Sequence, residues 1–353
     1  MPVVPVARLR DLAVGMLAAV GTRPDDAELV GKALIDANLT GHDSHGVIRL
    51  LNYVDWAQQG SIDPSARACL LSRQQSTAVV DAQWGWGQVA MMLAVETVID
   101  LARSYGTGAV AVRRSNHIGR VAPYVAKIAE AGMVGLAITN ANPAVAPYGG
   151  RRRVFGTNPI AWGVPRAGGR PPIVHDIATA GVAEGKLRVA RAKGAQVAPG
   201  LLLDADGEPT ENPDDFYAGG TLLPFGGHKG SGLSVLVQML GRGLAGAGPE
   251  GLGAHRGGNG PVVIALDIGA FTDLETFTEA TEAICTEIQA TPPATGFDDV
   301  LLPGELEERT ERERRAAGIP LPETTWSELQ ELAAVLGVGL NMLADAAGDV
   351  PRE

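Results

Sequence analysis

Three side chains with chemical potential stand close together early in the chain: Ser44, His45 and Arg49, in the stretch GHDSHGVIRL that begins at Gly41. A guanidinium can hold a carboxylate through two parallel hydrogen bonds, and an imidazole can transfer a proton near neutral pH. If the stretch is helical, His45, Arg49 and either Tyr53 or Asn52 lie one turn apart on one face. The pattern predicts an acid–base group beside a carboxylate clamp. The alternative is that Ser44 caps a helix and His45 is a hydrogen-bonded structural residue.

A second histidine, His117, lies in SNHIGR (residues 115–120), directly after the apolar run GAVAV. Loops that follow strands commonly carry reacting groups in α/β proteins, so His117 is a second candidate for proton transfer. His42 and His45, with Asp43, could instead bind a metal. Because neither an HExxH motif nor a set of cysteine ligands accompanies them, we expect no catalytic metal.

Two glycine-containing segments could contact phosphate. PFGGHKGSG (residues 224–232) combines four glycines with Lys229 and leads into a helix that we expect over 233–240. Such a segment exposes backbone amides at the positive end of a helix, although it could also be a simple capping turn. GTNP, with Thr157 and Asn158, allows the same two interpretations.

A strict GxGxxG pattern occurs at Gly241, Gly243 and Gly246. A dinucleotide-binding Rossmann loop needs a strand before these glycines and a helix that opens at them. The preceding residues 231–240 have a helical pattern, and the following residues 249–260 are too rich in glycine for a helix. We therefore interpret the motif as a coincidence of spacing.

The elements around these residues divide the chain in two. Residues 5–60 and 303–338 show helical spacing, whereas β-branched runs alternate with helices between about 70 and 295. We predict an α/β protein with a helical lobe made of residues 1–72 and 296–353 and an α/β lobe made of residues 73–295.

The whole chain of 353 residues carries a formal net charge of −11 and two cysteines. An acidic surface disfavours nucleic acid and anionic membranes as partners, while a local Arg or Lys can still bind a small anion. No apolar run approaches the length of a membrane span. We expect a reduced, cytoplasmic setting, and we interpret residues 8–20 as an amphipathic helix in preference to a secretion signal.

Seven motifs in order together resemble the malate/L-lactate dehydrogenase family of the second type, which is unrelated to the Rossmann dehydrogenases: GHDSHGVIRL, SNHIGR, NPAVAPYGG, FGTNPIAWGVP, HDIATA, LLPFGGHKGSGL and LLPGELEE. The resemblance covers residues 5–340. It implies a largely antiparallel cofactor sheet, NAD or NADP as cofactor, a small 2-hydroxy/2-oxo acid or a cyclic 2-imino acid as substrate, and a homodimer.

The resemblance also implies roles for individual residues. Ser44 and His45 match the active-site pair, and Arg49 matches the group that receives the substrate carboxylate, with Tyr53 beside it. His117 matches an acid–base histidine of some members. The expected cofactor contacts are His117, Ile118, Gly119, Arg120, Val121, Thr157, Asn158, Asp176, Ile177, Ala178, Lys229, Gly230, Gly304 and Glu305.

The chain departs from the family pattern at Ala141, where a hydroxyl residue is expected after Asn140. This makes a ureidoglycolate-like substrate less compatible with the sequence. A non-catalytic ligand-binding protein on the same fold is the rival interpretation, and a metal-dependent hydrolase is a third. Arg151, Arg152 and Arg153 could meet the 2′-phosphate of NADP or form an exposed basic turn.

Overall fold

The computed structural model describes residues 1–246 and 258–339. These residues form two compact units. The first consists of Met1–Arg67, Trp84–Val89 and the chain from Glu305 onward, and the second consists of Ala68–Gln83 and Ala90–Gly304. The chain passes from one unit to the other after residues 67 and 304, whereas the sequence-based boundaries are at 72 and 296. Residues 84–89 belong to the helical unit, which the sequence-based division did not include.

The first unit is helical. Its core contains Leu9, Met16, Leu34, Leu50 and Leu329, which come from different helices. Each helix contributes the apolar residues of one face. A short strand pair joins the two ends of the unit, since Val3 and Val4 pair with Pro320 and Ile319. The elements are β1 (Val3–Val4), α1 (Val6–Ala19), α2 (Pro24–Leu39), η1 (Asp43–His45), α3 (Arg49–Gln58), α11 (Glu305–Ala317), β12 (Ile319–Pro320) and α12 (Glu323–Val335).

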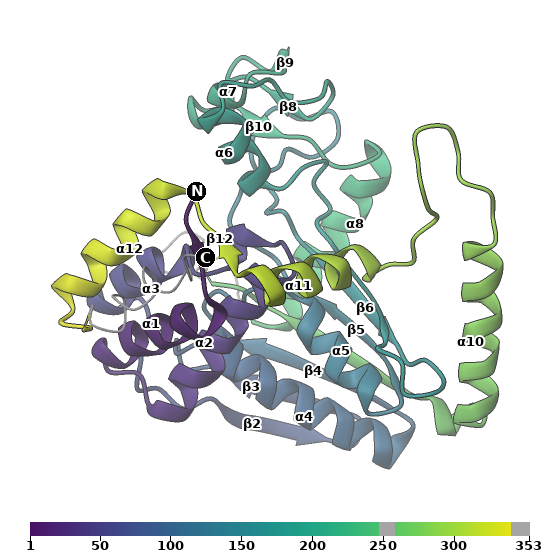
Figure 1. Cartoon of the computed structure of the whole chain (residues 1–353). Coiled ribbons are helices and arrows are strands. Elements are labelled where there is room, and N and C mark those ends of the chain that lie inside the picture. Colours follow the sequence, from purple (N-terminus) through teal and green to yellow (C-terminus); the bar gives the residue numbers. More distant parts are fainter. Residues whose placement is uncertain (247–257, 340–353) are drawn as a thin grey trace, which may run out of the picture. The chain divides into compact units, whose positions relative to one another are not determined.

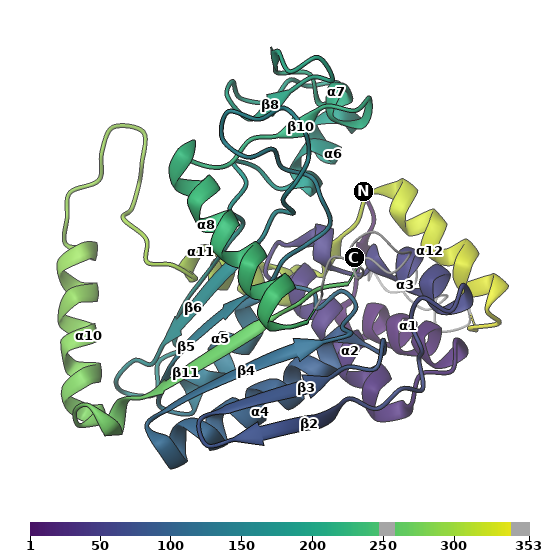
Figure 2. The ribbon, with the colours of Figure 1, turned by 180° about the vertical axis from the view of Figure 1, so that it is seen from behind.

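The second unit is built on a seven-stranded sheet in the order β2-β3-β4-β11-β5-β6-β7 (Figures 1 and 2). Among these strands the β3·β4 pair is parallel and the other five neighbouring pairs are antiparallel. The predicted largely antiparallel sheet is therefore confirmed. The strands are β2 (Cys69–Gln74), β3 (Thr77–Asp81), β4 (Thr107–Arg113), β5 (Met133–Ile138), β6 (Ile160–Val164), β7 (Ile173–Ile177) and β11 (Val262–Asp267).

Helices cover both faces of this sheet, which explains its apolar strands. Val110, Val112 and Val263 pack with α4 (Gly87–Tyr105) and α5 (Ala122–Glu130), which lie on one face in Figures 1 and 2. On the opposite face Ala111 and Val262 pack with Leu240 and Ala245, around the end of α8 (His228–Met239) and the π-helical turn η2 (Leu240–Leu244).

A small lobe of the second unit has its own core of Val145, Phe155, Leu187, Leu202 and Leu222. Its three-stranded sheet has the order β10-β8-β9. The elements are α6 (Glu184–Ala192), β8 (Leu202–Leu203), β9 (Pro209–Thr210), α7 (Pro213–Tyr217) and β10 (Thr221–Leu222). The sequence pattern did not indicate the strands of this lobe, because each of them is only two residues long.

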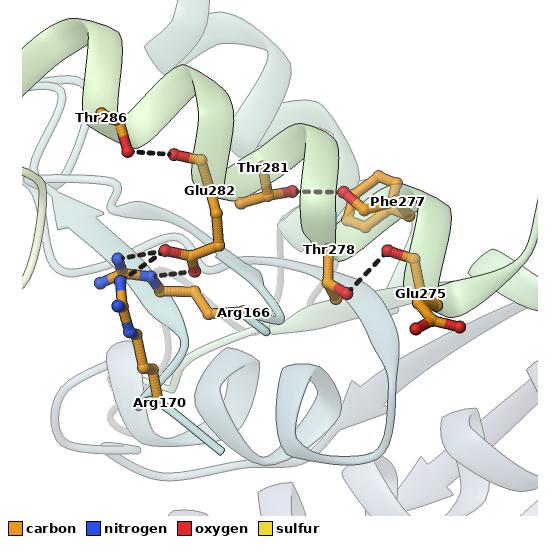
Figure 3. Close-up of polar contacts among 8 residues, drawn as sticks. All are labelled: Arg166, Arg170, Glu275, Phe277, Thr278, Thr281, Glu282 and Thr286. Carbon is orange, nitrogen blue, oxygen red and sulfur yellow. Dashed lines mark hydrogen bonds and ion pairs between the residues drawn. The ribbon is translucent and has the colours of Figure 1, made fainter. Parts of the chain in front are cut away.

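Helix α10 (Leu274–Gln289), which follows the 3-10 turn η3 (Ile268–Ala270), buries only Thr278 and Cys285. Its main polar attachment is Glu282, which accepts two hydrogen bonds from Arg166, at 2.8 and 2.9 Å, and one from Arg170 at 2.7 Å (Figure 3). The hydrogen bonds from Arg166, together with the charges of both guanidinium groups, lower the pKa of Glu282. The carboxylate therefore stays ionised and bound near neutral pH.

Two sequence-based boundaries need correction. The helix expected from His45 begins only at Arg49, after the 3-10 turn Asp43–His45. The helix expected from residue 233 begins at His228, so it includes Lys229 and Gly230. The glycine-rich residues 249–257, expected not to be helical, lie outside the described residues.

Candidate active site

The segment 41–49 connects α2 to α3 in the helical unit, and its path is determined by Asn38. The buried Asn38 side chain accepts a hydrogen bond from the Val47 amide at 2.8 Å and donates one to Asp43 Oδ1 at 2.7 Å. A Cβ atom at Gly46 would lie 2.1 Å from Asn38 Oδ1, so only glycine fits there. This close approach explains why the helix predicted from His45 is interrupted.

Within this loop the structure brings Ser44, His45 and Arg49 together. Ser44 Oγ lies 3.0 Å from His45 Nδ1, within hydrogen-bond distance. Arg49 Nε donates to the carbonyl oxygen of Ser44 at 2.6 Å. All three side chains are partly exposed. The loop therefore presents an alcohol, an imidazole and a guanidinium that are fixed relative to one another.

Tyr53 lies one turn beyond Arg49 on α3, but its side chain is in the core of the helical unit. Its hydroxyl accepts a hydrogen bond from the buried Gln88 at 2.7 Å, and its ring packs near Trp56 and Trp86. Burial raises the pKa of Tyr53 to about 12, against opposing effects of the Arg49 charge and the Gln88 bond. This environment suits a residue that supports α3, and direct contact with substrate stays a prediction.

In the α/β unit, the expected cofactor residues gather around the end of β7. Asp176 Oδ2 accepts hydrogen bonds from the amides of Val121 and Ala122 at 2.9 and 2.8 Å. A carboxylate is favourable at this position, because these amides open α5 and carry the positive end of its dipole. Ile177 and Ala178 follow directly, and an added Cβ at Gly304 would lie 3.4 Å from the carbonyl of Val174 in the same strand.

The loop that carries His117 lies against the segment before β11. Asn259, a buried residue that the sequence patterns did not single out, donates its amide to the Ser115 carbonyl at 2.9 Å. Its side chain accepts from the Ile118 amide at 3.2 Å and donates to the Asn140 carbonyl at 2.6 Å. Gly119 has a positive φ of 72°. His117, Gly119 and Arg120 are partly exposed in this loop, whereas Ile118 is buried.

Thr157 and Asn158 are joined to the end of β7 by a buried polar network. Thr179 Oγ1 donates to the carbonyls of Thr157 and Asn158 at 3.1 and 3.0 Å, and accepts from Ser234 Oγ at 2.8 Å. The Asn158 side chain accepts from the Ala141 amide at 3.1 Å. Because the Asn158 side chain is fully buried, this residue shapes the unit and presents at most its backbone to a ligand, whereas Thr157 is partly exposed.

The glycine-rich turn also reaches β7. The Phe225 amide donates to the Thr179 carbonyl at 3.0 Å, and Gly226 and Gly227 adopt positive φ values of 56° and 62°. Lys229 is exposed in the first turn of α8. A Cβ at Gly230 would lie 2.3 Å from the carbonyl of Phe225, so this glycine allows the turn to close on the helix. Segments 117–122, 157–158 and 225–230 thus all bond to β7 or to the residues that follow it.

A pocket of about 710 Å³ is lined in part by the glycine-rich turn, within the same unit. Tyr148, Arg151 and Asp206 contribute its polar edge. Arg151 donates to the carbonyl of Asp206 at 2.9 Å, and Arg152 is exposed. Arg153, in contrast, donates to the Gly220 carbonyl and stacks 4.1 Å from the ring centroid of Phe216. It therefore has a structural role.

Gly241 and Gly243 lie in η2, directly after helix α8, and Gly246 follows η2, so the motif lacks the preceding strand that a Rossmann loop requires. An added Cβ at Gly241 would lie 2.5 Å from Asn140 Oδ1, whereas nothing is within 4 Å of Gly243. Across residues 1–246 and 258–339, no group of three or more His, Cys, Asp or Glu is placed to hold a metal. No helix in the same ranges is both long and apolar enough to cross a membrane.

Sequence reasoning missed the residues that hold these loops, namely Asn38, Gln88, Asn259 and Arg314. Asn38 and Asn259 are isolated amides in otherwise ordinary stretches, so no spacing distinguishes them. Arg314 lies in the strongly charged stretch 303–318, where a solvent-exposed face is the simple interpretation. It bonds instead to Asp43, 271 residues earlier in the chain.

Comparisons with known proteins identify the family. The model of the malate/L-lactate dehydrogenase family matches residues 4–330. A malate dehydrogenase of Pyrococcus abyssi is 36% identical over 346 residues, 95% of each chain. A Δ¹-pyrroline-2-carboxylate/Δ¹-piperideine-2-carboxylate reductase of Pseudomonas syringae pv. tomato is 34% identical over 92% of this chain and 95% of its own. The solved structure of the sulfolactate dehydrogenase from Methanocaldococcus jannaschii has a TM-score of 0.88 at 32% identity, covering 96% of this chain and 99% of that one.

The match spans both units, and the relatives are covered almost entirely. The predicted resemblance and the predicted enzyme class are therefore confirmed. The chain belongs to the malate/L-lactate dehydrogenase family and is a nicotinamide-dependent oxidoreductase.

Proposed function

We propose that this protein reduces a small 2-oxo acid, or oxidises the 2-hydroxy acid, of the malate or lactate type. The observation that carries the proposal is the loop in which Ser44 is bonded both to His45 and to Arg49. Arg49 is the only one of the three that can hold a carboxylate by two donors, and His45 is the group that can exchange a proton. The nicotinamide, when bound, supplies or accepts the hydride at C2.

Ser44 gives His45 a defined chemical state in this proposal. When Nδ1 of the protonated imidazole donates to Ser44 Oγ, the proton on Nε2 can pass to the oxygen or nitrogen that forms at C2, and the neutral imidazole that remains keeps its Nδ1 proton on Ser44. Arg49 Nε bonds the Ser44 carbonyl, so the carboxylate clamp and the proton donor keep a fixed separation. Such fixed geometry is what a reaction between two bound groups requires.

The residues around the end of β7 suit NAD or NADP. Exposed Lys229 supplies a positive charge, and the glycines before it leave the backbone open where a side chain would stand. We propose that segments 117–121 and 176–178, Thr157, Asn158, Lys229, Gly230, Gly304 and Glu305 hold the cofactor. Arg151 is exposed near the glycine-rich turn, so the test below compares NADH with NADPH, and it compares His117 with His45 as the proton donor.

Two further statements belong to the proposal. A cyclic 2-imino acid is the alternative substrate, which the Pseudomonas syringae relative favours because its name gives that reaction. We also propose a cytoplasmic homodimer without nucleic acid or membrane partners. Cys69 and Cys285 form no disulfide, and α8 exposes Leu233, Leu236 and Met239 along one stripe that a second copy could cover.

A direct test is an assay of NADH and NADPH oxidation with pyruvate, oxaloacetate, phenylpyruvate and piperideine-2-carboxylate. We expect turnover with at least one acid, and no loss on addition of a chelator. On that substrate, the true donor among His45→Ala and His117→Ala should lose 10²–10⁴-fold in kcat, in the range of general-acid groups. No turnover with any of the four would contradict the proposed substrates. Losses below tenfold in both variants would contradict the proton-donor assignment, and chelator sensitivity would contradict a reaction without a catalytic metal.

A further inference from the structure

Helix α11 places one charged face against the loop that carries Ser44 and His45. Glu307 Oε1 lies 3.3 Å from His42 Nε2. A Cβ at Gly41 would lie 3.3 Å from the methyl group of Thr310. Arg314 bonds to the next part of the loop. Residues 307, 310 and 314 follow the i, i+3, i+7 spacing of a single helical face, so this side of α11 lies along the loop from Gly41 to Asp43.

Arg314 makes the strongest of these contacts. Its Nη1 donates to Asp43 Oδ1 at 2.6 Å, and its Nη2 donates to Asp43 Oδ2 at 3.1 Å. Nη1 also donates to the backbone carbonyl of Asn38. The Arg314 side chain is 17% exposed and that of Asp43 is 46% exposed, so water screens this bidentate pair in part, although less than a pair in which both side chains are fully exposed.

Through Asn38 and Asp43, Arg314 is connected to the backbone on both sides of Ser44 and His45. Asp43 precedes Ser44 directly and is bonded to Arg314 and to Asn38 Nδ2. Asn38 Oδ1 holds the Val47 amide on the far side of His45. The backbone on either side of Ser44 and His45 is therefore tied to one guanidinium, either directly or through one side chain.

We propose that Arg314 is a positioning residue, which fixes Ser44 and His45 through Asp43 and Asn38. Arg49 is affected through the same loop, because its Nε bonds the Ser44 carbonyl. This proposal rests on the proposed function, in which His45 donates the proton and Arg49 holds the carboxylate. Arg314 itself does not touch the reacting atoms in this account.

The test compares Arg314→Gln with Arg315→Gln. Arg315 is the adjacent arginine and pairs with Glu311 in its own helix at 2.8 Å, so it is a matched control for charge and helix stability. We expect Arg314→Gln to lower kcat 10–100-fold and to raise KM for the acid, with KM for NAD(P)H changed less than twofold. Arg315→Gln should retain wild-type values. Arg314→Lys, which keeps the charge but not the fork, should fall between wild type and Arg314→Gln.

A double-mutant cycle checks the route. If Arg314 acts through Asp43, the double variant Arg314→Gln/Asp43→Asn should be no worse than the poorer single variant. Fully additive losses would contradict the route through Asp43. Equal losses in Arg314→Gln and Arg315→Gln would mean that the effect is one of helix stability, and would overturn the proposal.

The imidazole resonances of His45 in an NMR spectrum give a readout that does not need activity. In folded Arg314→Gln, with a melting temperature near that of the wild type, the His45 signals should shift or broaden while those of His117 stay in place. Unchanged His45 signals would overturn the positioning role even if no acid were turned over. If the His45 signals shift but the wild-type protein reduces none of the tested acids, the positioning role of Arg314 is supported and the proposed function is contradicted. If Arg314→Gln does not fold, the same signals are compared in Arg314→Lys, with the same two outcomes.

Discussion

At the scale of single residues, the roles suggested by residue type depend on burial. The spacing of Ser44, His45 and Arg49 identifies them as a group, and in the structure they are partly exposed, with Ser44 bonded to both of the others. Tyr53 shares their helical face, but its side chain is fully buried. The spacing of residues on a helix predicts the direction in which a side chain points, but it does not predict how deeply that side chain is buried. The buried amides Asn38 and Gln88 could not be found from spacing, because their partners come from other elements.

Tyr53 leads to a prediction about pH. Its pKa is raised by burial from 10.0 to about 12, so the fold favours the neutral phenol. The resulting stabilisation is complete below pH 10 and is lost as the pH rises towards 12, with about 1.4 kcal/mol lost by pH 11. In Tyr53→Phe this loss is absent. Below pH 9 the variant should instead be less stable by about 1–3 kcal/mol, because Gln88 Nε2 loses its acceptor.

The measurement is denaturant unfolding of both proteins at pH 8, 9, 10 and 11. The difference in unfolding free energy between wild type and Tyr53→Phe should narrow above pH 10. Tyr105→Phe is the matched control, because Tyr105 is exposed and should show no such pH dependence. A difference that stays constant from pH 8 to pH 11 would show that Tyr53 ionises normally.

Lys229 gives a prediction about cofactor binding at the same scale. Lys229→Ala should weaken NAD(P)H binding by about 1–3 kcal/mol, as expected for a charge-assisted hydrogen bond to phosphate. Lys193→Ala, which removes another exposed lysine of the same unit, should have no effect. A fluorescence titration measures both dissociation constants. Equal values for Lys229→Ala and wild type would remove Lys229 from the cofactor site.

At the scale of elements, the long and strongly patterned pieces could be predicted, and the short or exposed ones could not. β4 and β11 have apolar residues on both faces and were evident as strands. β2 is exposed at every position, so its sequence lacks the apolar alternation that marks a strand. Helix α10 carries Leu274, Ile284 and Ile288 at helical spacing, yet all three are exposed, so its sequence does not show how little of the helix is buried. The break before α3 was missed because it comes from Asn38 in the preceding helix, not from the loop's own composition.

Substitutions at the GxGxxG glycines test whether these residues serve packing or cofactor binding. Gly241→Ala should destabilise the α/β unit by about 1–3 kcal/mol, because the new methyl group would overlap Asn140 and the backbone of Gly260. Gly243→Ala points into open space and should stabilise the helical turn by about 0.5–1 kcal/mol.

Thermal unfolding and a cofactor titration of both variants distinguish the two interpretations. Opposite shifts in melting temperature, with NAD(P)H affinity retained in Gly243→Ala, are the expected outcome. If Gly243→Ala lost cofactor affinity at an unchanged melting temperature, the glycines would have to contact the cofactor despite the helix that precedes them.

At the scale of the whole molecule, the net charge of −11 contrasts with the positive groups offered to ligands. Arg49 and Lys229 are local cations in an acidic protein, so they can select small anions while the surface repels polyanions. Composition could predict this broad class, and the ordered motifs could predict the family. Neither could predict which surface the proposed homodimer would use, because exposed apolar residues are common in all proteins.

The α8 stripe makes the proposed homodimer testable. Leu236 and Met239 are 50% and 67% exposed, and a charge placed there would be buried without a partner if a second copy covered them. Leu236→Glu and Met239→Glu should therefore weaken self-association at least 100-fold, which is about 2.7 kcal/mol. Val335→Glu adds the same charge at another exposed apolar position, on α12, and should remain as associated as wild type. Sedimentation equilibrium measures the self-association, and circular dichroism checks that each variant is folded. A monomeric wild type would contradict the proposed dimer. Folded variants of Leu236 and Met239 that remain dimeric would show that the α8 stripe is not the dimer interface.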